Sequence, residues 1–345
     1  MNNHSSMTNF ELINHYKNKV ILVTGGTGSI GSQIVGELVK YSPGKIIILS
    51  KDDSKQYLMK QRFKENKDIF YLLGDIRDYQ RVEYVSRDVD YIFHAAALKQ
   101  VPTCEENPDE AIKTNLLGSL NIIEASIKNN VKKVINISTD KAVNPTNTMG
   151  ATKLLAEKLF KQANMKLNNT STKFSSVRFG NVLGSRGSVI PLLLDQLLKG
   201  KPLTITDLNM TRFFMSIQDA AELTLKAGVY AEGGETYILK MKALRLSDLV
   251  DGLKKFSEQR QLTAPDVQII GRRQGEKLYE ELATESELKE IYESEDLLVI
   301  SSKCPNTTIF NKISLSDYRS DKVSMISQEE ILQILKGLEK KCTGE

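Results

Sequence analysis

The chain has 345 residues, of which 40% are hydrophobic and 26% are charged, a composition typical of globular proteins and long enough for one large core or two joined domains. Its formal net charge is +4, and the basic residues are spread along the chain without runs that interleave with aromatic residues, so we expect no nucleic-acid partner. A small anionic ligand is a simpler explanation for this modest basic excess.

The cysteines and the N-terminus suggest the cellular setting. None of the three cysteines belongs to a CxxC pair, so we expect neither a metal site nor a disulfide framework. Residues 1–18 are polar and lack the apolar segment of a signal peptide, and no stretch approaches the roughly 18 apolar residues of a membrane span. The sequence therefore predicts a cytoplasmic protein with no membrane span.

The first half of the chain alternates apolar strands with helices, after a short helix predicted over residues 9–16. Helices are expected up to about residues 40 and 86 and over residues 54–64, 109–130 and 147–167, and the strands that alternate with them are predicted over residues 19–23, 45–49, 69–73, 89–94, 133–138 and 173–178. Six strands in this alternation predict an α/β fold, a doubly wound parallel Rossmann sheet with right-handed crossovers.

After about Asn181 the elements become shorter and glycine and proline more frequent. Helices are predicted over residues 189–199, 217–227, 246–256 and 327–338, and strands over residues 202–205 and 267–270. We therefore expect a lead-in over 1–18, a dinucleotide-binding domain over 19–181, and a smaller C-terminal α/β substrate lobe over 182–338. Segments of that lobe are expected to return to the first domain, and residues 339–345 are expected to form a flexible tail.

Glycines at positions 25, 28 and 31 follow the first strand and open a helix, in the order that dinucleotide-binding folds use. Gly25 permits a tight turn, Gly28 lets the backbone approach a pyrophosphate, and Gly31 permits close packing of helix and strand. A plain tight turn would also explain a lone glycine pattern. Because the loop follows the first strand of a sheet of this kind, we expect a dinucleotide, bound by the loop residues Thr24, Gly25, Thr27, Gly28, Ser29, Ile30 and Gly31.

The end of the second strand indicates which dinucleotide is bound. Lys51 and Lys55, together with Ser50, suit the 2′-phosphate of NADP, whereas Asp52 suits the free ribose hydroxyl of NAD. We predict NADP and keep NAD open. Further cofactor contacts are expected after the third and fourth strands, from Asp75, Ile76, Ala95, Ala96 and Ala97, whereas His94 is expected to be a packed residue at a strand end.

Proton-handling groups gather where the fifth strand ends, at Thr139, Asp140 and Lys141, and a further lysine, Lys153, lies on the helix that follows. Ligands bind at this end of the strands in open α/β sheets. Met149 lies one helical turn before Lys153, at the place where nicotinamide oxidoreductases of this shape usually carry tyrosine. A solvated ion pair at a strand end would also explain Asp140 and Lys141.

Together these segments resemble the extended short-chain dehydrogenase/reductases, and within them the UDP-N-acetylglucosamine 4,6-dehydratases. The resemblance covers roughly residues 18–300, and its markers are residues 24–31, 94–102, 138–153, 178–189 and 273–277 together with Asn115. It implies UDP-N-acetylglucosamine as substrate and a tightly bound NADP or NAD that is regenerated in each turnover. It also implies a homodimer or larger homo-oligomer, formed by pairing of the helices predicted over 109–130 and 147–167.

The resemblance implies roles for the residues around the missing tyrosine. Asp140 becomes the acid that protonates the leaving hydroxyl at C6, Lys141 the base at C5, and Lys153 the group that holds the nicotinamide ribose. For the proton of the C4 hydroxyl three outcomes stay open: Thr139 relays it, Asp140 serves twice, or the protein is inactive. Membrane-bound relatives also carry methionine at this place and are active, which favours Thr139 and, weakly, retention of configuration at C5. Met149 would then contact the sugar or the nicotinamide.

The remaining site residues are implied by resemblance to the nucleotide-sugar cradle. Asn115 is expected at the cofactor, and the substrate is expected to contact Lys99, Asn181, Arg186, Ser188, Val189, Thr204, Thr211, Arg212, Arg273 and Glu276. Two alternatives to the dehydratase stay open, a UDP-sugar 4-epimerase and an inactive protein that binds NADP and a nucleotide sugar.

Overall fold

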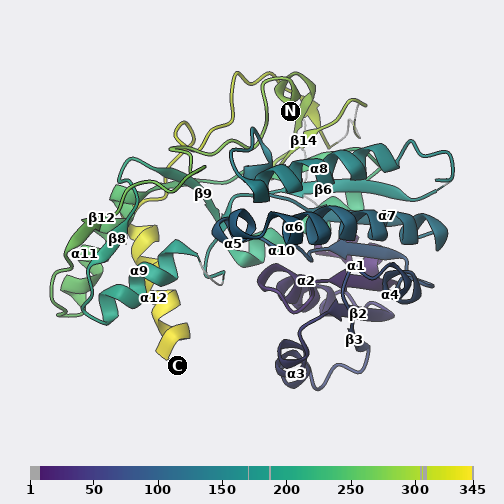
Figure 1. Ribbon diagram of the computed structural model, residues 1–345, viewed down its shortest axis with the longest axis horizontal. Coiled ribbons are helices and arrows are strands. Elements are labelled where there is room, and N and C mark those ends of the chain that lie inside the picture. Colours follow the sequence, from purple (N-terminus) through teal and green to yellow (C-terminus); the bar gives the residue numbers. More distant parts are fainter. Residues whose placement is uncertain (1–7, 170, 186–187, 304, 306–308, 344–345) are drawn as a thin grey trace. The chain divides into compact units, whose positions relative to one another are not determined.

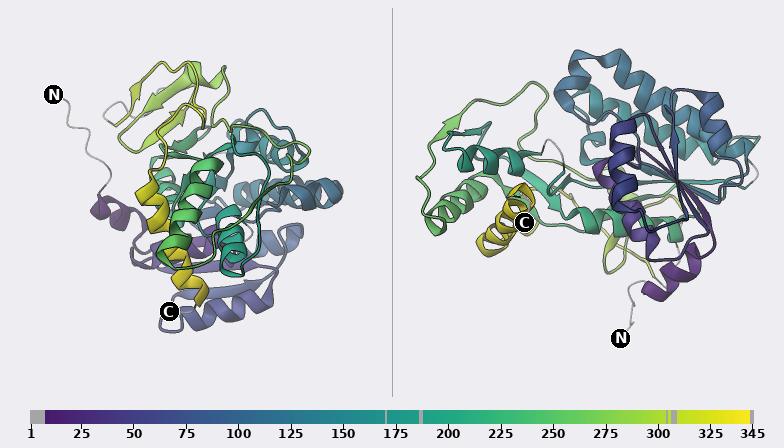
Figure 2. Two further views of the ribbon diagram at one scale, coloured as in Figure 1. Left: turned by 90° about the vertical axis from the view of Figure 1, so that its left-hand side faces the viewer. Right: turned by 90° about the horizontal axis from the view of Figure 1, so that it is seen from below.

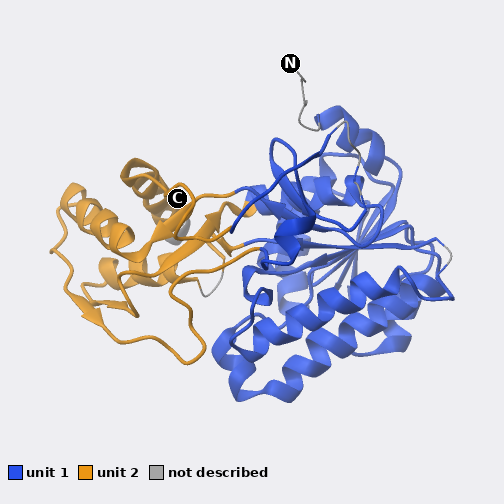
Figure 3. Ribbon diagram, turned by 90° about the horizontal axis from the view of Figure 1, so that it is seen from above, with its two compact units in different colours: residues 1–179, 218–240, 283–317 blue, residues 180–217, 241–282, 318–345 orange. Residues whose placement is uncertain are grey.

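The structure is a computed structural model that describes residues 8–169, 171–185, 188–303, 305 and 309–343. The chain divides into two compact units (Figure 3). The larger unit comprises residues 1–179, 218–240 and 283–317, and the smaller unit comprises residues 180–217, 241–282 and 318–345. The chain therefore passes between the two units several times, and the second half of the sequence contributes to both.

A ten-stranded sheet, in the order β15-β13-β14-β10-β6-β5-β4-β1-β2-β3, forms the centre of the larger unit (Figure 1). The six predicted strands are confirmed and are parallel to their neighbours. They are β1 (Val20–Thr24), β2 (Lys45–Ser50), β3 (Ile69–Leu73), β4 (Tyr91–His94), β5 (Lys133–Ile137) and β6 (Lys173–Arg178). Their order places the carboxyl ends of β1, β4 and β5 next to each other, as a doubly wound dinucleotide fold requires.

Four further strands, which the sequence pattern did not predict, extend this sheet beyond β6. The strand β10 (Thr236–Leu239) pairs parallel with β6, and the last three are antiparallel. These are β14 (Leu297–Ile300), β13 (Ile291–Glu293) and β15 (Asn311–Lys312), preceded by the 3₁₀ turn η3 (Glu287–Glu290).

Helices cover both faces of the sheet (Figures 1 and 3). On one face, the buried side chains Ile92, Val134 and Phe174 pack against Ile122 and Phe160 of two long helices. On the other face, the ring of Tyr16 lies against Phe93, and the Tyr16 hydroxyl donates to Leu225 O at 2.6 Å. The helices of this unit are α1 (Asn9–Tyr16), α2 (Ser29–Val39), α3 (Asp53–Arg62), α4 (Tyr79–Val85), α5 (Val101–Glu106), α6 (Pro108–Ile112), α7 (Gly118–Lys128), α8 (Thr148–Ala163) and α10 (Ile217–Tyr230).

The single helix predicted over residues 109–130 is wrong in detail. It consists of α6, a π-helical turn η1 (Lys113–Leu117) and α7. The turn contains Asn115, whose side chain bonds outside the helix, and α7 begins at Gly118, where a Cβ atom would lie 2.6 Å from Ile76 Cδ1. The π-helical turn thus lies where Asn115 bonds outside the helix and Gly118 lies close to Ile76, and the apolar periodicity of the sequence does not reveal it.

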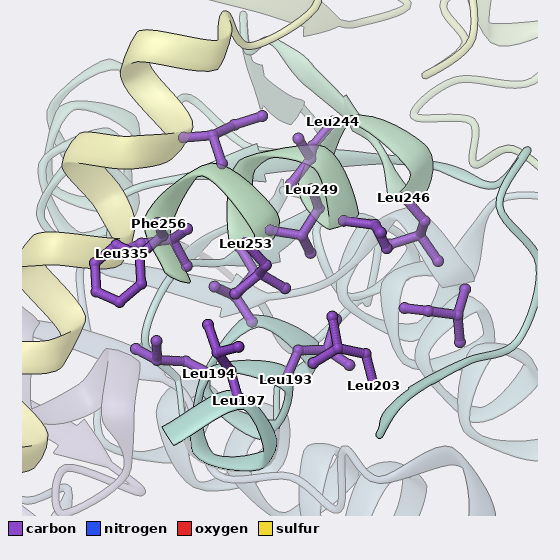
Figure 4. Close-up of a cluster of buried hydrophobic side chains, with 14 of the residues drawn as sticks. Leu193, Leu194, Leu197, Leu203, Leu244, Leu246, Leu249, Leu253, Phe256 and Leu335 are labelled. Carbon is purple, nitrogen blue, oxygen red and sulfur yellow. The ribbon is translucent and has the colours of Figure 1, made fainter. Parts of the chain in front are cut away.

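The smaller unit has a core of its own between three helices and short strands (Figure 4). Its helices are α9 (Val189–Leu198), α11 (Leu246–Gln259) and α12 (Gln328–Thr343), and α11 and α12 lie side by side (Figure 2). Its strands are β7 (Asn181–Val182), β8 (Leu203–Ile205), β9 (Thr211–Met215), β11 (Ala243–Arg245) and β12 (Val267–Ile269). Helix α12 continues into the segment predicted as a tail, up to Thr343, and Arg260 Nε donates to Glu339 Oε1 at 3.2 Å.

Candidate active site

The glycine loop between β1 and α2 has the shape that a bound pyrophosphate requires. Gly25 has a φ of +64°, and a Cβ atom there would lie 2.7 Å from Ala96 in the segment after β4. At Gly31 a Cβ atom would lie 2.4 Å from Gly25 O. Helix α2 begins at Ser29 after Gly28, and among the described residues no side chain caps its first N–H groups. The loop therefore presents free backbone donors at a positive helix end, which fits the diphosphate of a dinucleotide.

Charged side chains surround the ends of β2 and β3. Thr27 Oγ1 lies 2.8 Å from Ser50 Oγ, which fixes the loop to the end of β2. Lys51 Nζ lies 3.7 Å from Asp75, and Lys55 bonds to Asp52, which also caps α3. Both lysines are half exposed and tethered by carboxylates rather than buried in the protein.

Asp75 is held by a neighbour that the sequence reasoning did not single out. The Arg77 side chain bonds Asp75 Oδ2 through Nε at 2.9 Å and through Nη2 at 2.7 Å. Burial alone would raise the pKa of Asp75, but the hydrogen bonds and charge of Arg77 outweigh it and lower that pKa. The side chain of Ile76 is buried, and Ile76 O accepts a hydrogen bond from Asn121.

The segment after β4 is fixed to β1 and to the helices. Ala95 N–H donates to Thr24 O at 3.1 Å, and Thr24 Oγ1 lies 2.8 Å from His94 Nδ1. His94 is fully buried, and burial together with Lys153 lowers its pKa to about 3. The ring is therefore neutral and packed, as expected. Ala97 and Lys99 follow on the exposed part of the segment.

Asn115, predicted at the cofactor, has a structural use for every polar atom of its side chain. Its Nδ2 donates to Leu98 O and to Thr152 Oγ1, each at 3.0 Å, and its Oδ1 accepts from Leu98 N–H at 2.8 Å. The amide thus ties the segment after β4 to α8. A direct contact of Asn115 with the cofactor stays a prediction.

Thr139, Asp140 and Lys141 form one hydrogen-bonded group at the end of β5. Thr139 Oγ1 donates to Asp140 Oδ1 at 2.8 Å, and Lys141 Nζ donates to the same oxygen at 3.0 Å. Asp140 is fully buried, whereas the side chain of Lys141 is partly exposed. Asp140 and Ala142 bound a short 3₁₀ turn, η2 (Asp140–Ala142), which begins because Thr139 is extended and caps it. The Thr139 hydroxyl and the Lys141 amino group thereby both reach one oxygen of the Asp140 carboxyl group, so protons can pass among the three.

Helix α8 brings Lys153 to the same end of the sheet. Asn147 caps α8 by accepting from Gly150 N–H at 2.8 Å. At Gly150 a Cβ atom would lie 2.2 Å from Lys141 O, so only glycine allows the start of α8 to lie against η2. Burial lowers the pKa of Lys153 to about 8, and the nearby Glu157 carboxylate partly offsets this. No hydrogen bond of the Lys153 side chain is found within the described part of the chain, which leaves its donors for a ligand.

Met149 packs into a small apolar cluster rather than standing open. Only 4% of its surface is exposed, and it lies with Cys104 of α5 and Ala111 of α6. A thioether cannot take the place of an acid or a base. The structure therefore gives Met149 a packing role, and its contact with sugar or nicotinamide stays a prediction.

The predicted substrate residues of the smaller unit fall into two groups. Arg212 on β9 donates to Thr211 O at 2.8 Å and to Lys277 O at 2.9 Å, and Glu276 lies 3.7 Å from its guanidinium. Glu276 in turn accepts from Arg273 N–H at 3.1 Å. The structure thus brings Thr211, Arg212, Arg273 and Glu276 together around one loop.

The other predicted residues of this unit lie elsewhere in it. Thr204 on β8 is bonded at both its N–H and its hydroxyl by the Gln196 side chain, at 3.0 and 2.9 Å. Ser188 and Val189 begin α9, and Asn181 lies on β7. Arg186 lies outside the described residues.

A buried ion triad in the larger unit was not predicted as part of the site. Arg178 at the end of β6 bonds Glu157 of α8 through Nη2 at 2.6 Å and Glu287 through Nη2 at 2.8 Å. Glu157 lies one turn after Lys153 on α8. Arg178 begins one of the sequence markers of the resemblance, residues 178–189, but no local sequence pattern identifies Glu157 and Glu287 as its partners.

Comparison with known proteins supplies the family. Residues 21–302 match the polysaccharide biosynthesis protein family. A UDP-N-acetylglucosamine 4,6-dehydratase (inverting) from Campylobacter jejuni is 44% identical over 290 residues, which cover 83% of this chain and 84% of that protein. A UDP-glucose 4-epimerase from Rickettsia bellii is 39% identical over 340 residues, covering 94% and 97%.

A solved structure agrees with this assignment. The X-ray structure of Pen from Bacillus thuringiensis matches with a TM-score of 0.87 and 40% sequence identity, covering 93% of this chain and 98% of that chain. Among the described residues, no helix is long and apolar enough to cross a bilayer. The fold, the glycine loop and these matches together confirm the resemblance, and the chain belongs to the polysaccharide biosynthesis protein family within the extended short-chain dehydrogenase/reductases.

Proposed function

We propose that this protein is an NADP-dependent UDP-N-acetylglucosamine 4,6-dehydratase that makes a UDP-4-keto-6-deoxy-N-acetylhexosamine for surface-sugar biosynthesis. The observation that carries the proposal is the bonded group of Thr139, Asp140 and Lys141 at the end of β5. Dehydration across C5 and C6 needs an acid and a base in one pocket, whereas epimerisation at C4 does not need this pair. Relatives that act on nucleotide sugars support the substrate class.

The larger unit would hold the nicotinamide cofactor. The free N–H groups of α2 would bind the diphosphate, Lys51 and Lys55 the 2′-phosphate, and Lys153 the nicotinamide ribose. When bound, the cofactor supplies a hydride acceptor at C4 and a hydride donor at C6, and ends each turnover oxidised.

The chain's own residues would move the protons. As the C4 hydroxyl gives its proton to Thr139 Oγ1, Thr139 passes its own proton to Asp140 Oδ1, to which it is already bonded at 2.8 Å. Lys141, in its neutral amine form, removes the proton at C5, which the C4 ketone has acidified. Asp140 then returns the relayed proton to the C6 hydroxyl, which leaves as water, and Lys141 delivers its proton back to C5. Every proton taken is thereby used, so the cycle closes without a tyrosine.

One incubation tests the reaction. UDP-N-acetylglucosamine is incubated with the protein and NADP in deuterated water, and the product is analysed by NMR and mass spectrometry. We expect a 4-keto-6-deoxy sugar that carries deuterium at C5, because solvent exchanges with the proton on Lys141. The same spectrum reads the C5 configuration, for which Met149 favours retention.

A UDP-sugar 4-epimerase is the second candidate, because the Rickettsia bellii relative is named a UDP-glucose 4-epimerase and matches this chain over almost its whole length. It predicts unlabelled UDP-N-acetylgalactosamine from the same incubation. No turnover despite bound cofactor would instead support an inactive binding protein. A Lys141→Ala variant that dehydrates at the wild-type rate would refute the assigned base at C5.

We also propose a homodimer formed through the face of α6, η1 and α8. Three large apolar side chains there are 45–51% exposed, namely Ile112, Leu117 and Leu155. Burying such side chains against a second copy would stabilise the pair, and isologous helix pairing is a common dimer geometry. Size-exclusion chromatography with light scattering is expected to give at least twice the 38.7 kDa chain mass, and a monomer alone would refute the dimer.

A further inference from the structure

Three buried polar side chains follow one another along β5 and the turn after it, namely Asn136, Ser138 and Asp140. The backbone stays paired with β6 through this stretch, since Ser138 N–H donates to Val177 O at 2.7 Å and Asp140 N–H donates to Phe179 O at 3.2 Å. Side chains of an extended backbone alternate between the two faces of the sheet, so Asn136 and Ser138 lie on the same face. Asp140 begins the turn η2 and is buried like these two residues, whereas Ile137 and Thr139 between them are only partly buried. We call Asn136, Ser138 and Asp140 the polar row.

The polar row faces helix α8, which runs alongside β6 in Figure 1. Asn136 is in register with Ser176 of β6, so both side chains lie on one face. Two residues further along β6, on that same face, Arg178 reaches Glu157 of α8. The row is thus enclosed between the sheet and the helix that carries Lys153.

Each member of the polar row has one buried atom without a hydrogen-bond partner among the described residues: Asn136 Oδ1, Ser138 Oγ and Asp140 Oδ2. Buried polar atoms are normally paired with protein or with ordered water. The Cα atoms of residues two apart on a strand are separated by about 6.6 Å, so short side chains that stand side by side on one face are spaced too widely for a direct bond. Two hydrogen bonds through one water span about 5.6 Å, and a spacing of this order suits one bridging water.

A polar cavity reaches Ser176, the β6 neighbour of Asn136, and gives water a place to enter. It has a volume of about 250 Å³ and is lined by residues that include Ser176, Arg178, Glu157 and Glu287. Asn136 Nδ2 donates to Ser176 Oγ at 3.2 Å, which links the row to the cavity wall. A polar cavity of this size holds several waters.

We propose that ordered waters fill the α8-facing side of β5 and join Asp140 Oδ2 through Ser138 to Asn136, so that Ser138 and Asn136 are positioning residues for the Asp140 carboxyl group. The inference rests on the role proposed above for Asp140. Thr139 and Lys141 hold only Oδ1, so the carboxyl plane can still turn about that oxygen. Water on Oδ2 fixes the plane and keeps Oδ1 aligned with its two donors.

A crystal structure of the protein with NADP, at a resolution that shows ordered waters, tests the proposal directly. We expect a water within hydrogen-bond distance of both Ser138 Oγ and Asp140 Oδ2. A dry interface there overturns the proposal, whether or not the protein proves to be a dehydratase. If the wild type shows no dehydratase turnover, the proposed function fails, and this structure still decides the water.

Kinetics test the positioning role. Ser138→Ala is expected to lower kcat roughly three- to tenfold with little change in KM, because the variant loses the hydrogen bond to the water that holds the Asp140 carboxyl group. Ser138→Thr keeps the hydroxyl and is expected to recover most of kcat. The matched control is Ser126→Ala on α7, a fully buried serine whose Oγ donates to Ile122 O at 2.6 Å, and it should leave kcat unchanged.

Two kinetic results would overturn the positioning role. One is a Ser138→Ala variant with the kcat of the Ser126→Ala control. The other is a loss that Ser138→Thr does not recover, which would assign packing rather than hydrogen bonding to this side chain. Circular dichroism identifies variants that fail to fold, and for these the crystal structure of the wild type decides.

Discussion

Replacing Glu287 by glutamine should destabilise the protein in a way that depends on pH. Glu287 is 21% exposed and accepts two hydrogen bonds from Arg178, at 2.8 and 2.9 Å, and one from Thr284 N–H at 2.9 Å. Burial alone would raise the pKa of Glu287, but these bonds and the charge of Arg178 lower it from 4.5 to about 2. At about 1.36 kcal/mol per pH unit, the ionised carboxylate contributes roughly 3 kcal/mol to folding.

The sign of the pH effect follows from the direction of that shift. Because the folded pKa lies below the unfolded value, the contribution is complete above about pH 4.5 and is lost as the pH falls towards 2. We therefore expect Glu287→Gln to lower the free energy of unfolding by roughly 3 kcal/mol at pH 7 and by only about 2 kcal/mol at pH 3.5.

Urea unfolding followed by circular dichroism measures both values. The matched control is Glu290→Gln, a nearby exposed carboxylate with no ion pair in the described part of the chain, for which we expect little change at either pH. An equal loss at pH 7 and pH 3.5 would refute the ionic origin of the stabilisation. A decrease of less than about 1 kcal/mol in the free energy of unfolding at pH 7 would show that Glu157 alone compensates the buried charge of Arg178.

Three further predictions concern the site. Met149→Leu conserves volume and should retain most turnover and stability, whereas Met149→Ala should lose about 2–5 kcal/mol of stability in urea unfolding. A large loss of kcat in Met149→Leu would show that the thioether touches the substrate. Thr139→Val should lower kcat about 10²–10⁴-fold while Thr139→Ser retains activity, and a valine variant above a tenth of the wild-type rate would exclude the relay. Lys51→Ala should weaken NADP binding about tenfold in calorimetry and leave NAD binding unchanged. Equal weakening of both would show that Lys51 does not bind the 2′-phosphate.

Much of the sheet follows from local sequence, and its far edge does not. The strands β1 to β6 are apolar runs separated by helices, so each carries its own signal. The strands β13 and β14 are three or four residues long and come from a segment that returns after most of the smaller unit. Such short strands are defined by pairing, of β14 with β10 and of β13 with β14, and pairing between distant segments has no local pattern.

The site divides in the same way between local and distant contacts. Thr139, Asp140 and Lys141 are adjacent, so their grouping could be read from the chain. Arg178 and Glu287, by contrast, are brought together only by the extension of the sheet. The use of Asn115 as a tie between the segment after β4 and α8 was also hidden, because a buried amide and an amide at a cofactor look alike in sequence.

If the protein is the proposed dehydratase, Met149 bears on which group accepts the proton of the C4 hydroxyl. The side chain at position 149 is buried against Cys104 and Ala111, so α8 offers no acid or base at that position, and under the proposed function the acceptor is Thr139 at the end of β5. Thr139 meets the requirement, because its hydroxyl already donates to Asp140 and an oxygen that donates can still accept. A hydroxyl that accepts one proton while it passes on another carries no lasting charge, since Asp140 receives the proton. Under the proposed function, a chain with methionine at position 149 therefore depends on how firmly Asp140 is held.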